Sequence, residues 1–283
     1  MLPKLARNKA SKNGERIMID ITWIMESSFG GAHYWLMIQD EYSGHIWSMF
    51  LQKKSDQVDV ILTWIKKIIK YEQVDIKYIR CDNSGENHSL QDSIEEDKDL
   101  RIKFEFTAPY TPQQNGKIER KFATLYGKGR AMLNWAKLTD FLRKGLWAQC
   151  ALLATELENI IYRHGETKSA AEKFYGKNPD WIYHLHTFGE IGFVHDGKDP
   201  HTKAKLADRG YPCMFIGYAE DHAPNVFKFM NLNKRSMITS RDVTWLNKSY
   251  GEYKQLKNPI VIEAEQSDDD DDESIVEMEI ESL

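Results

Sequence analysis

The sequence predicts an α/β fold, in which a mixed five-stranded sheet with flanking helices is followed by a small all-β module. Strand and helix patterns alternate up to about residue 165 in the order β-β-β-α-β-(α)-β-α, with one helix optional. After about residue 186 the pattern changes to short strands separated by frequent turns. Hydrophobic residues make up 41% of the 283 residues and charged residues 29%, so a wholly disordered chain is excluded.

The first three predicted strands lie at 16–24, 34–39 and 46–51. Residues 16–24 (RIMIDITWI) are apolar on both alternating faces except at Asp20, which is typical of a strand buried on both sides. The second and third strands flank the short turn DEYSG, which contains Gly44. We therefore expect these two strands to form a hairpin.

Helices are expected at about 56–72, from about Asn115 onward, and at about 140–163. In the first of these, apolar residues recur every three or four positions from Val58 to Ile69 and form one face. A strand at 76–81 ends at Asp82. The turn NSGE and a polar stretch then lead to a strand at 102–106.

Charge is segregated along the chain. The net charge is -5, but residues 263–283 hold eleven acidic side chains and no Lys or Arg, so the rest of the chain carries +6. A basic body suits a polyanionic partner, although a solvated basic surface is an alternative. The expected segments are a basic flexible arm (1–15), an α/β core (16–165), a connecting helix (166–185), a small β module (186–248) and an acidic disordered tail (249–283).

Targeting and cysteine patterns narrow the class of protein further. No apolar run approaches the roughly 18 residues of a membrane-spanning helix, and the N-terminus has no stretch of signal-peptide length. We therefore expect an intracellular protein that has no membrane partner and is not secreted. Cys81, Cys150 and Cys213 lie far apart without CxxC spacing, so neither a disulfide framework nor a cysteine-rich zinc site is indicated.

Three carboxylates are candidates for a common site. Each has an ordinary alternative: a hydrogen bond or ion pair for Asp20, an Asx-turn for Asp82, and a favourable helix dipole for Glu119. If the first strand lies beside the fourth, however, Asp20 and Asp82 are neighbours, and the following helix can bring Glu119 to the same edge. Three carboxylates without His or Cys favour Mg²⁺ or Mn²⁺ over zinc. Two such ions about 4 Å apart promote in-line displacement at phosphorus.

The residues around these carboxylates resemble a known family. MID at 18–20, CDNSGE at 81–86 and PYTPQQNGKIER at 109–120 are similar to the catalytic blocks of retroviral-type integrase cores, which have a ribonuclease H-like fold. Asp82 and Glu119 have 36 intervening residues, close to the spacing that characterises the family. Further segments resemble copia-type LTR retrotransposon integrases, so that the likeness covers about 15–248; they are IQDEYSGHIW (38–47), AAEKFYGKNPD (170–180), TFGEIGFV (187–194), YPCMFIGY (211–218) and TSRDVTW (239–245).

The resemblance implies roles for individual residues. Asp20, Asp82 and Glu119 become ligands of two Mg²⁺ or Mn²⁺ ions, with no zinc expected in this chain. Asp40 matches an acidic position in the family's hairpin; we interpret it as structural and as the fallback for the first ligand. The residues expected to meet DNA are Gln113, Asn115 and Gly116 in a flexible loop, and Lys117, Arg120, Lys121, Lys128 and Arg130 on the following basic helix, where a solvated helix face is the alternative.

The leading functional hypothesis is a polynucleotidyl transferase that trims DNA 3′ ends and joins them to target DNA. It implies double-stranded DNA as partner, a homo-oligomer as the active form, and a location in the nucleus or in a cytoplasmic pre-integration particle. A second hypothesis is a decayed or domesticated core that binds DNA or protein without turnover. A third is a ribonuclease H-type nuclease with the same metal site, against which the small β module and the TPQQNG block argue.

Overall fold

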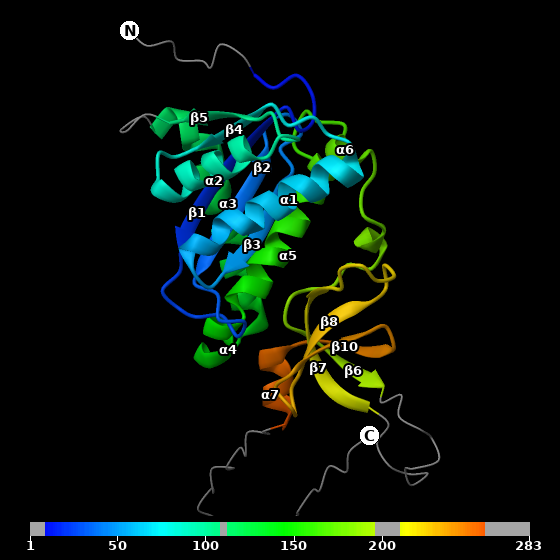
Figure 1. The fold of residues 1–283 in the computed structure, drawn as a ribbon. Helices are drawn as coiled ribbons and strands as arrows, with labels where there is room; N and C mark the ends of the chain where they lie inside the picture. The colour runs from blue at the N-terminus through cyan, green and yellow to red at the C-terminus, as the bar shows by residue number, and fades with distance from the viewer. Residues whose placement is uncertain (1–8, 108–111, 196–209, 258–283) are drawn as a thin grey trace, which may run out of the picture.

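The computed structural model describes residues 9–107, 112–195 and 210–257 and shows a core followed by a β module (Figure 1). The core contains a mixed five-stranded sheet in the order β3-β2-β1-β4-β5. Strand β1 is antiparallel to β2 and parallel to β4, as a ribonuclease H-like sheet requires, so the predicted fold class is confirmed. The strands are β1 (Arg16–Trp23), β2 (Tyr34–Asp40), β3 (Ile46–Leu51), β4 (Tyr78–Cys81) and β5 (Lys103–Phe106).

Helices cover both faces of this sheet. Ile17 and Ile19 of β1 pack toward α1 and α2, whereas Met18 between them packs toward α3 and α5. The alternation explains why the first strand is apolar on both faces. The helices of the core are α1 (Gln57–Glu72), which follows the short η1 (Lys54–Asp56), α2 (Gly85–Glu96), α3 (Pro112–Ala136), α4 (Asp140–Gly145) and α5 (Trp147–Ile160).

The long helix expected at about 140–163 is instead two helices, α4 and α5, separated at Leu146. The N–H of Phe29 donates to the carbonyl of Gly145 at 2.8 Å, and a Cβ at Gly145 would lie 2.3 Å from the Phe29 ring. The loop after β1 therefore uses a carbonyl that a continuous helix would need for itself. The expected connecting helix at 166–185 is likewise reduced to α6 (Ala170–Tyr175) and the short η2 (Asp180–Tyr183).

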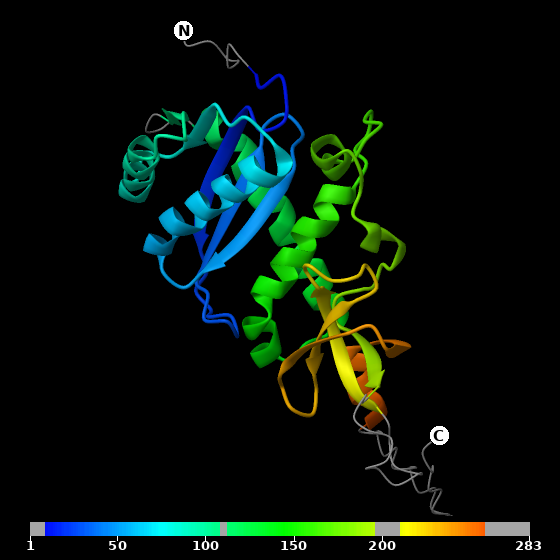
Figure 2. The same cartoon turned by 45° about the vertical axis from the view of Figure 1, so that its right-hand side comes forward.

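The β module has its own five-stranded antiparallel sheet in the order β10-β6-β7-β8-β9, separate from the core sheet as expected. Its aromatic interior, which includes Phe188, Phe215 and Phe229, is continuous with Leu146, between α4 and α5, and with Leu153 of α5. Figure 2 shows the module beside one end of α5. Its strands are β6 (Glu190–His195), β7 (Gly210–Tyr218), β8 (Phe227–Asn231), β9 (Met237–Ser240) and β10 (Val243–Ser249).

The expectation of a disordered tail from residue 249 was wrong for its first residues, because α7 (Tyr250–Lys257) packs on the module. Tyr250 and Tyr253 are buried there, and Ser249 and Glu252 form a capping pair in which each backbone N–H donates to the other side chain. Two tyrosines and one cap thus hold a helix that has little apolar periodicity of its own. The acidic residues 258–283 lie outside the described residues.

Residues 9–15 were expected to belong to a flexible arm, but the structure places them on the core. The N–H of Gly14 donates to Asp40 at 2.8 Å, and the N–H of Ala10 donates to Glu41 at 3.0 Å. Both carboxylates are buried and need donors, which the arm supplies. Residues 1–8 lie outside the described residues.

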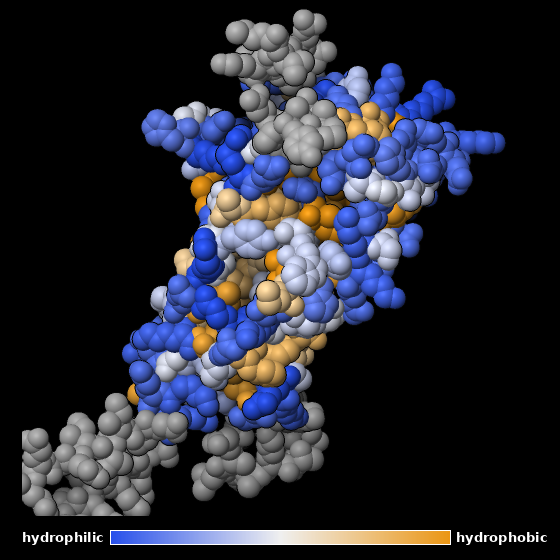
Figure 3. Space-filling model, turned by 90° about the vertical axis from the view of Figure 1, so that its left-hand side faces the viewer, coloured by the Kyte–Doolittle hydropathy of each residue, from blue (hydrophilic) through white to orange (hydrophobic). Residues whose placement is uncertain are grey.

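The surface is mixed. On the face seen in Figure 3, apolar side chains show mainly through the middle of the molecule, and hydrophilic side chains dominate its periphery. No helix among the described residues is both long enough and apolar enough to span a bilayer.

Candidate active site

The pairing of β1 with β4 brings two candidate carboxylates to the same level of the sheet. Met18 is level with Arg80 in this parallel pair. Extending that register by two residues sets Asp20 beside Asp82, at the carboxyl end of β4. Since the strands are parallel, both chains continue in the same direction beyond this pair, which directs Asp20 and Asp82 toward the carboxyl end of β4.

Glu119 comes from α3, which packs on the same face of the sheet as Asp20. Ile118 and Phe122 of this helix are buried against Met18 and its neighbours, so the helix is fixed on both sides of Glu119. Glu119 itself is exposed, as is Asp82, whereas Asp20 is half-buried.

Electrostatics link the three carboxylates. Burial raises the pKa of Asp20 to about 6; a hydrogen bond from the N–H of Ile21 opposes this rise, and the charges of Asp82 and Glu119 add to it. Both charges therefore act on Asp20 across the site. A bound cation would reverse this balance, because it stabilises the ionised form of every carboxylate around it.

The donor set fits a hard divalent ion, but the side chains do not enclose one. Asp20, Asp82 and Glu119 supply oxygen only, which suits Mg²⁺ or Mn²⁺. In the parts of the chain that the structure describes, no three His, Cys, Asp or Glu side chains lie close enough together to hold a metal ion. Mutual repulsion of unpaired carboxylates opposes a tighter arrangement, and a cation would remove it.

Asp40, the fallback for the first ligand, has a structural role in the β2–β3 hairpin. It is fully buried and level with Ile17, not with Asp20. Its carboxylate accepts hydrogen bonds from the N–H of Gly14 at 2.8 Å and from the N–H and hydroxyl of Ser43 at 2.7 and 2.6 Å. The structural interpretation is therefore the one that the geometry supports.

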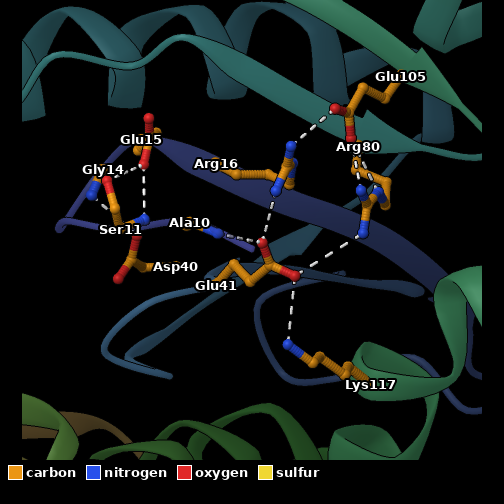
Figure 4. A network of polar contacts seen from close by, with 10 residues as sticks. All are labelled: Ala10, Ser11, Gly14, Glu15, Arg16, Asp40, Glu41, Arg80, Glu105 and Lys117. Atoms are coloured by element: carbon orange, nitrogen blue, oxygen red, sulfur yellow. Dashed lines mark hydrogen bonds and ion pairs between the residues drawn. The ribbon is translucent and has the colours of Figure 1, made fainter. Parts of the chain in front are cut away.

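A network of ion pairs around the buried Glu41 side chain reaches α3 at Lys117 (Figure 4). Glu41, whose side chain is 4% exposed, lies 2.8 Å from Arg16, 3.8 Å from Arg80 and 3.2 Å from Lys117. Arg16 and Arg80 also bind Glu105 of β5, at 2.9 and 2.7 Å. Lys117 is thereby held against the sheet two residues before Glu119.

Two of the expected DNA-binding lysines are engaged inside the protein. Lys121 and Lys128 each lie 2.6 Å from Glu158 of α5, and Arg163 binds the same carboxylate at 3.0 Å. The side chains of Lys121 and Lys128 are only 15% and 28% exposed. Both lysines therefore connect α3 to α5. Counting charges along the helix could not show this, because the partner carboxylate belongs to another helix.

The remaining candidates for DNA contact differ from these lysines. Arg120 and Arg130 are exposed, and within the described residues neither makes an ion pair. Gly116 is buried, and the Arg120 guanidinium lies 3.3 Å from where a Cβ would stand at Gly116. The side chains of Gln113 and Asn115 lie outside the described residues.

Sequence reasoning missed two buried amides beside the site. Asn87 of α2 donates to the carboxylate of Asp82 at 2.6 Å, and Gln57 of α1 donates to Asn87 at 3.1 Å. The one feature of the sequence that could have identified them is that each is a polar residue on the inner face of its helix.

The comparisons with known proteins support the resemblance. Residues 191–259 match the family model described as "Retroviral polymerase SH3-like domain". The chain is 31% identical over 228 residues, 80% of its length, to the retrovirus-related Pol polyprotein from transposon TNT 1-94 of Nicotiana tabacum. It is 25% identical over 83% of its length to the corresponding polyprotein from transposon RE2 of Arabidopsis thaliana. The chain spans only 16% and 15% of these relatives.

Solved integrase structures are also similar at low identity. A chain of the simian T-cell lymphotropic virus intasome, solved in complex with PP2A regulatory subunit B56 gamma, is 14% identical with a TM-score of 0.48; the match covers 87% of this chain and 83% of that one. The catalytic core domain of BIV integrase is 17% identical with a TM-score of 0.41, over 58% and 95% of the two chains. The family model and the transposon Pol relatives by themselves confirm the resemblance of this chain to copia-type retrotransposon proteins.

Proposed function

We propose that this chain is the catalytic part of a copia-type retrotransposon integrase, a polynucleotidyl transferase that joins DNA 3′ ends to target DNA. The observation that carries the proposal is the parallel pairing of β1 with β4, which directs Asp20 and Asp82 toward one end of the sheet, with α3 and its Glu119 packed on the same face as Asp20. It occurs in a chain that is similar to transposon Pol polyproteins over 80% of its length.

Asp20, Asp82 and Glu119 would hold the metal ions. Two divalent ions bound there would activate an attacking hydroxyl and stabilise a leaving oxygen at phosphorus. In end processing, the oxygen of water bonds to phosphorus near the DNA 3′ end and the P–O bond to the terminal fragment breaks. In strand transfer, the resulting 3′-hydroxyl bonds to a target phosphorus as a target P–O bond breaks. The protein itself positions the carboxylates and the DNA.

The DNA backbone would lie along α3. A cavity of about 410 Å³ beside this helix and the β2–β3 hairpin is lined by five cationic side chains and two acidic ones. Arg120 makes no ion pair among the described residues, whereas the other four cations each have a carboxylate partner, so Arg120 would be the first of them to attract phosphate, without reading sequence. The cationic residues are Lys117, Arg120, Lys121, Arg163 and Lys173.

The second candidate function is a DNA-binding core without turnover. It is favoured by the separation of the carboxylates, since no three metal-ligating side chains of the described residues form a closed site. In that case Asp20, Asp82 and Glu119 would be ordinary charged residues at a sheet edge, and the basic surface alone would act.

An oligonucleotide strand-transfer assay in Mn²⁺ distinguishes the two functions. We expect joined products with the wild-type chain and none with Asp82→Asn, while both bind DNA equally. Turnover that survives Asp82→Asn would refute the proposed site. Equal DNA binding with no turnover in either protein would support the binding module. Cleavage of an RNA–DNA hybrid in preference to joining would instead indicate a ribonuclease H-type nuclease.

Activity would require more than one copy of the chain, because the two DNA ends must be held together for joining. Analytical ultracentrifugation with and without DNA ends tests this expectation. A nuclear location, which the proposed reaction requires, is testable with a fluorescent fusion.

A further inference from the structure

We infer that Asn87, oriented by Gln57, is a positioning residue that sets the Asp82 carboxylate for metal binding. The inference rests on the proposed function and adds a residue to its site. Asn87 lies in the first turn of α2 and is 5% exposed. Its Nδ2 donates to Asp82 Oδ1 at 2.6 Å and to the Asp82 carbonyl at 3.2 Å. One amide thus fixes both the side chain and the backbone of Asp82.

Asp82 needs such a constraint because it lies beyond the last residue of β4. Its side chain is exposed, and no other hydrogen bond to its carboxylate occurs within the described residues. Without Asn87 the carboxylate would be free to rotate between staggered conformers. Because Asn87 uses Oδ1 alone, Oδ2 stays available to a cation.

Gln57 determines which way the Asn87 amide points. Gln57 is 1% exposed at the start of α1, and its Nε2 donates to Asn87 Oδ1 at 3.1 Å. An amide oxygen that accepts from Gln57 leaves the amide nitrogen to face Asp82, so the donor rather than the acceptor meets the carboxylate. The hydrogen bonds therefore run from Gln57 to Asn87 and from Asn87 to Asp82. The two amides are uncharged, and the Asp82 carboxylate carries the one charge of this chain of hydrogen bonds.

The unpaired carbonyl oxygen of the Gln57 side chain supports the interpretation that Gln57 acts through Asn87. The Oε1 of Gln57 is buried without a hydrogen-bond partner among the described residues. A buried acceptor left unpaired is destabilising, and an apolar side chain of similar size would avoid this cost. Within the part of the chain that the structure describes, the donation to Asn87 is the one hydrogen bond of this side chain, and an apolar residue could not make it.

Hydrogen-bonding partners of metal ligands affect metal affinity measurably. Loss of such a partner typically weakens metal affinity or activity by about 10–100-fold. We expect Asn87→Ala to weaken Mn²⁺ binding by a factor in this range. We expect Gln57→Met, which keeps the volume and Asn87 but removes the orienting donor, to have a smaller effect of the same sign.

The test measures Mn²⁺ binding directly, by electron paramagnetic resonance of the free ion, on the full chain without DNA. Asn83→Ala is the matched control, because Asn83 lies in the same turn and its exposed side chain contacts His88 at 2.7 Å rather than Asp82. It should bind Mn²⁺ as the wild type does. DNA affinity in the absence of metal should be the same in all variants.

A merely structural role would lower thermal stability and leave the Mn²⁺ dissociation constant unchanged, and this result for Asn87→Ala would overturn the inference. If Asn87→Ala does not fold, Gln57→Met decides, and unchanged Mn²⁺ affinity in that variant is the contradicting result. Asp82→Asn separates the two proposals. If it leaves Mn²⁺ binding intact, the proposed metal site fails and the inference fails with it. If it abolishes binding while Asn87→Ala and Gln57→Met do not weaken it, only the inference fails.

Discussion

Replacing Glu158 by glutamine tests the electrostatic joint between α3 and α5. The side chain of Glu158 is 7% exposed and lies within 3.0 Å of Lys121, Lys128 and Arg163. Glutamine keeps the shape of the side chain but removes its charge, so three cations lose their common partner. An uncompensated buried charge is among the most destabilising changes a protein can undergo.

The magnitude follows from the proton affinity of the carboxylate. Burial alone would raise the pKa of Glu158, but the hydrogen bond from Lys121 and the ion pair with Lys128 outweigh it and lower the pKa from 4.5 to about 2. The lowered pKa stabilises the folded state by about 3 kcal/mol at neutral pH, since each tenfold change in proton affinity corresponds to roughly 1.4 kcal/mol. Since the folded-state pKa is lowered, the stabilisation is present in full above pH 4.5 and is lost as the pH falls toward about 2.

Urea denaturation followed by tryptophan fluorescence measures this effect. We expect Glu158→Gln to lower the free energy of unfolding by about 3 kcal/mol at pH 7 and by only about 1.5 kcal/mol at pH 3. Glu166→Gln is the control, because Glu166 pairs with Lys173 at the surface, where it is 47% exposed. That change should cost less than about 1 kcal/mol.

A loss of the same size at both pH values would refute the reasoning, since it would arise from packing rather than from charge. A loss no larger than that of Glu166→Gln would show that the three cations do not depend on Glu158. Either result would also return Lys121 and Lys128 to the set of free cations available to DNA.

Three further predictions concern single side chains. Arg130→Gln should weaken DNA binding and reduce the salt dependence of the affinity by about one counterion, because Arg130 is exposed and unpaired among the described residues. Lys128→Gln should chiefly lower the free energy of unfolding, by about 1–3 kcal/mol, because Lys128 is paired with Glu158. DNA affinity measured against salt and urea denaturation compare the two variants, and an equal loss of DNA affinity would contradict the assignment. Gly127→Ala should raise the free energy of unfolding by about 0.5–1 kcal/mol, because alanine favours the helix and nothing lies within 4 Å of an added Cβ in α3. A destabilised variant would show that the helix is not regular there. Glu156→Gln should remove a pH dependence of the free energy of unfolding, because burial raises the pKa of Glu156 to about 8 and folding then takes up a proton between about pH 4.5 and 8. Between pH 4.5 and 7 the wild type should lose about 3 kcal/mol of stability relative to the variant. Parallel pH profiles from urea denaturation would refute the burial of this carboxyl.

The sequence by itself determined the fold class and the three candidate carboxylates. Alternation in 16–24 identified a strand buried on both faces, and the helical face from Val58 to Ile69 identified α1. Both signals are local, because they depend on the backbone period rather than on the partner. Asp20 lies within β1 and Asp82 directly follows β4, and the expectation that the two are neighbours depended on the first strand lying beside the fourth.

Tertiary structure alone decided which polar groups meet. Nothing in the local pattern shows that Phe29 takes the carbonyl of Gly145 and ends α4, or that Glu158 engages Lys121. The same holds for the contact between Asn87 and Asp82. A lysine on a helix has the same sequence pattern whether solvent, DNA or a buried carboxylate receives its charge. The choice depends on which groups the folded chain removes from water, because burial makes a polar contact strong when it is paired and costly when it is not.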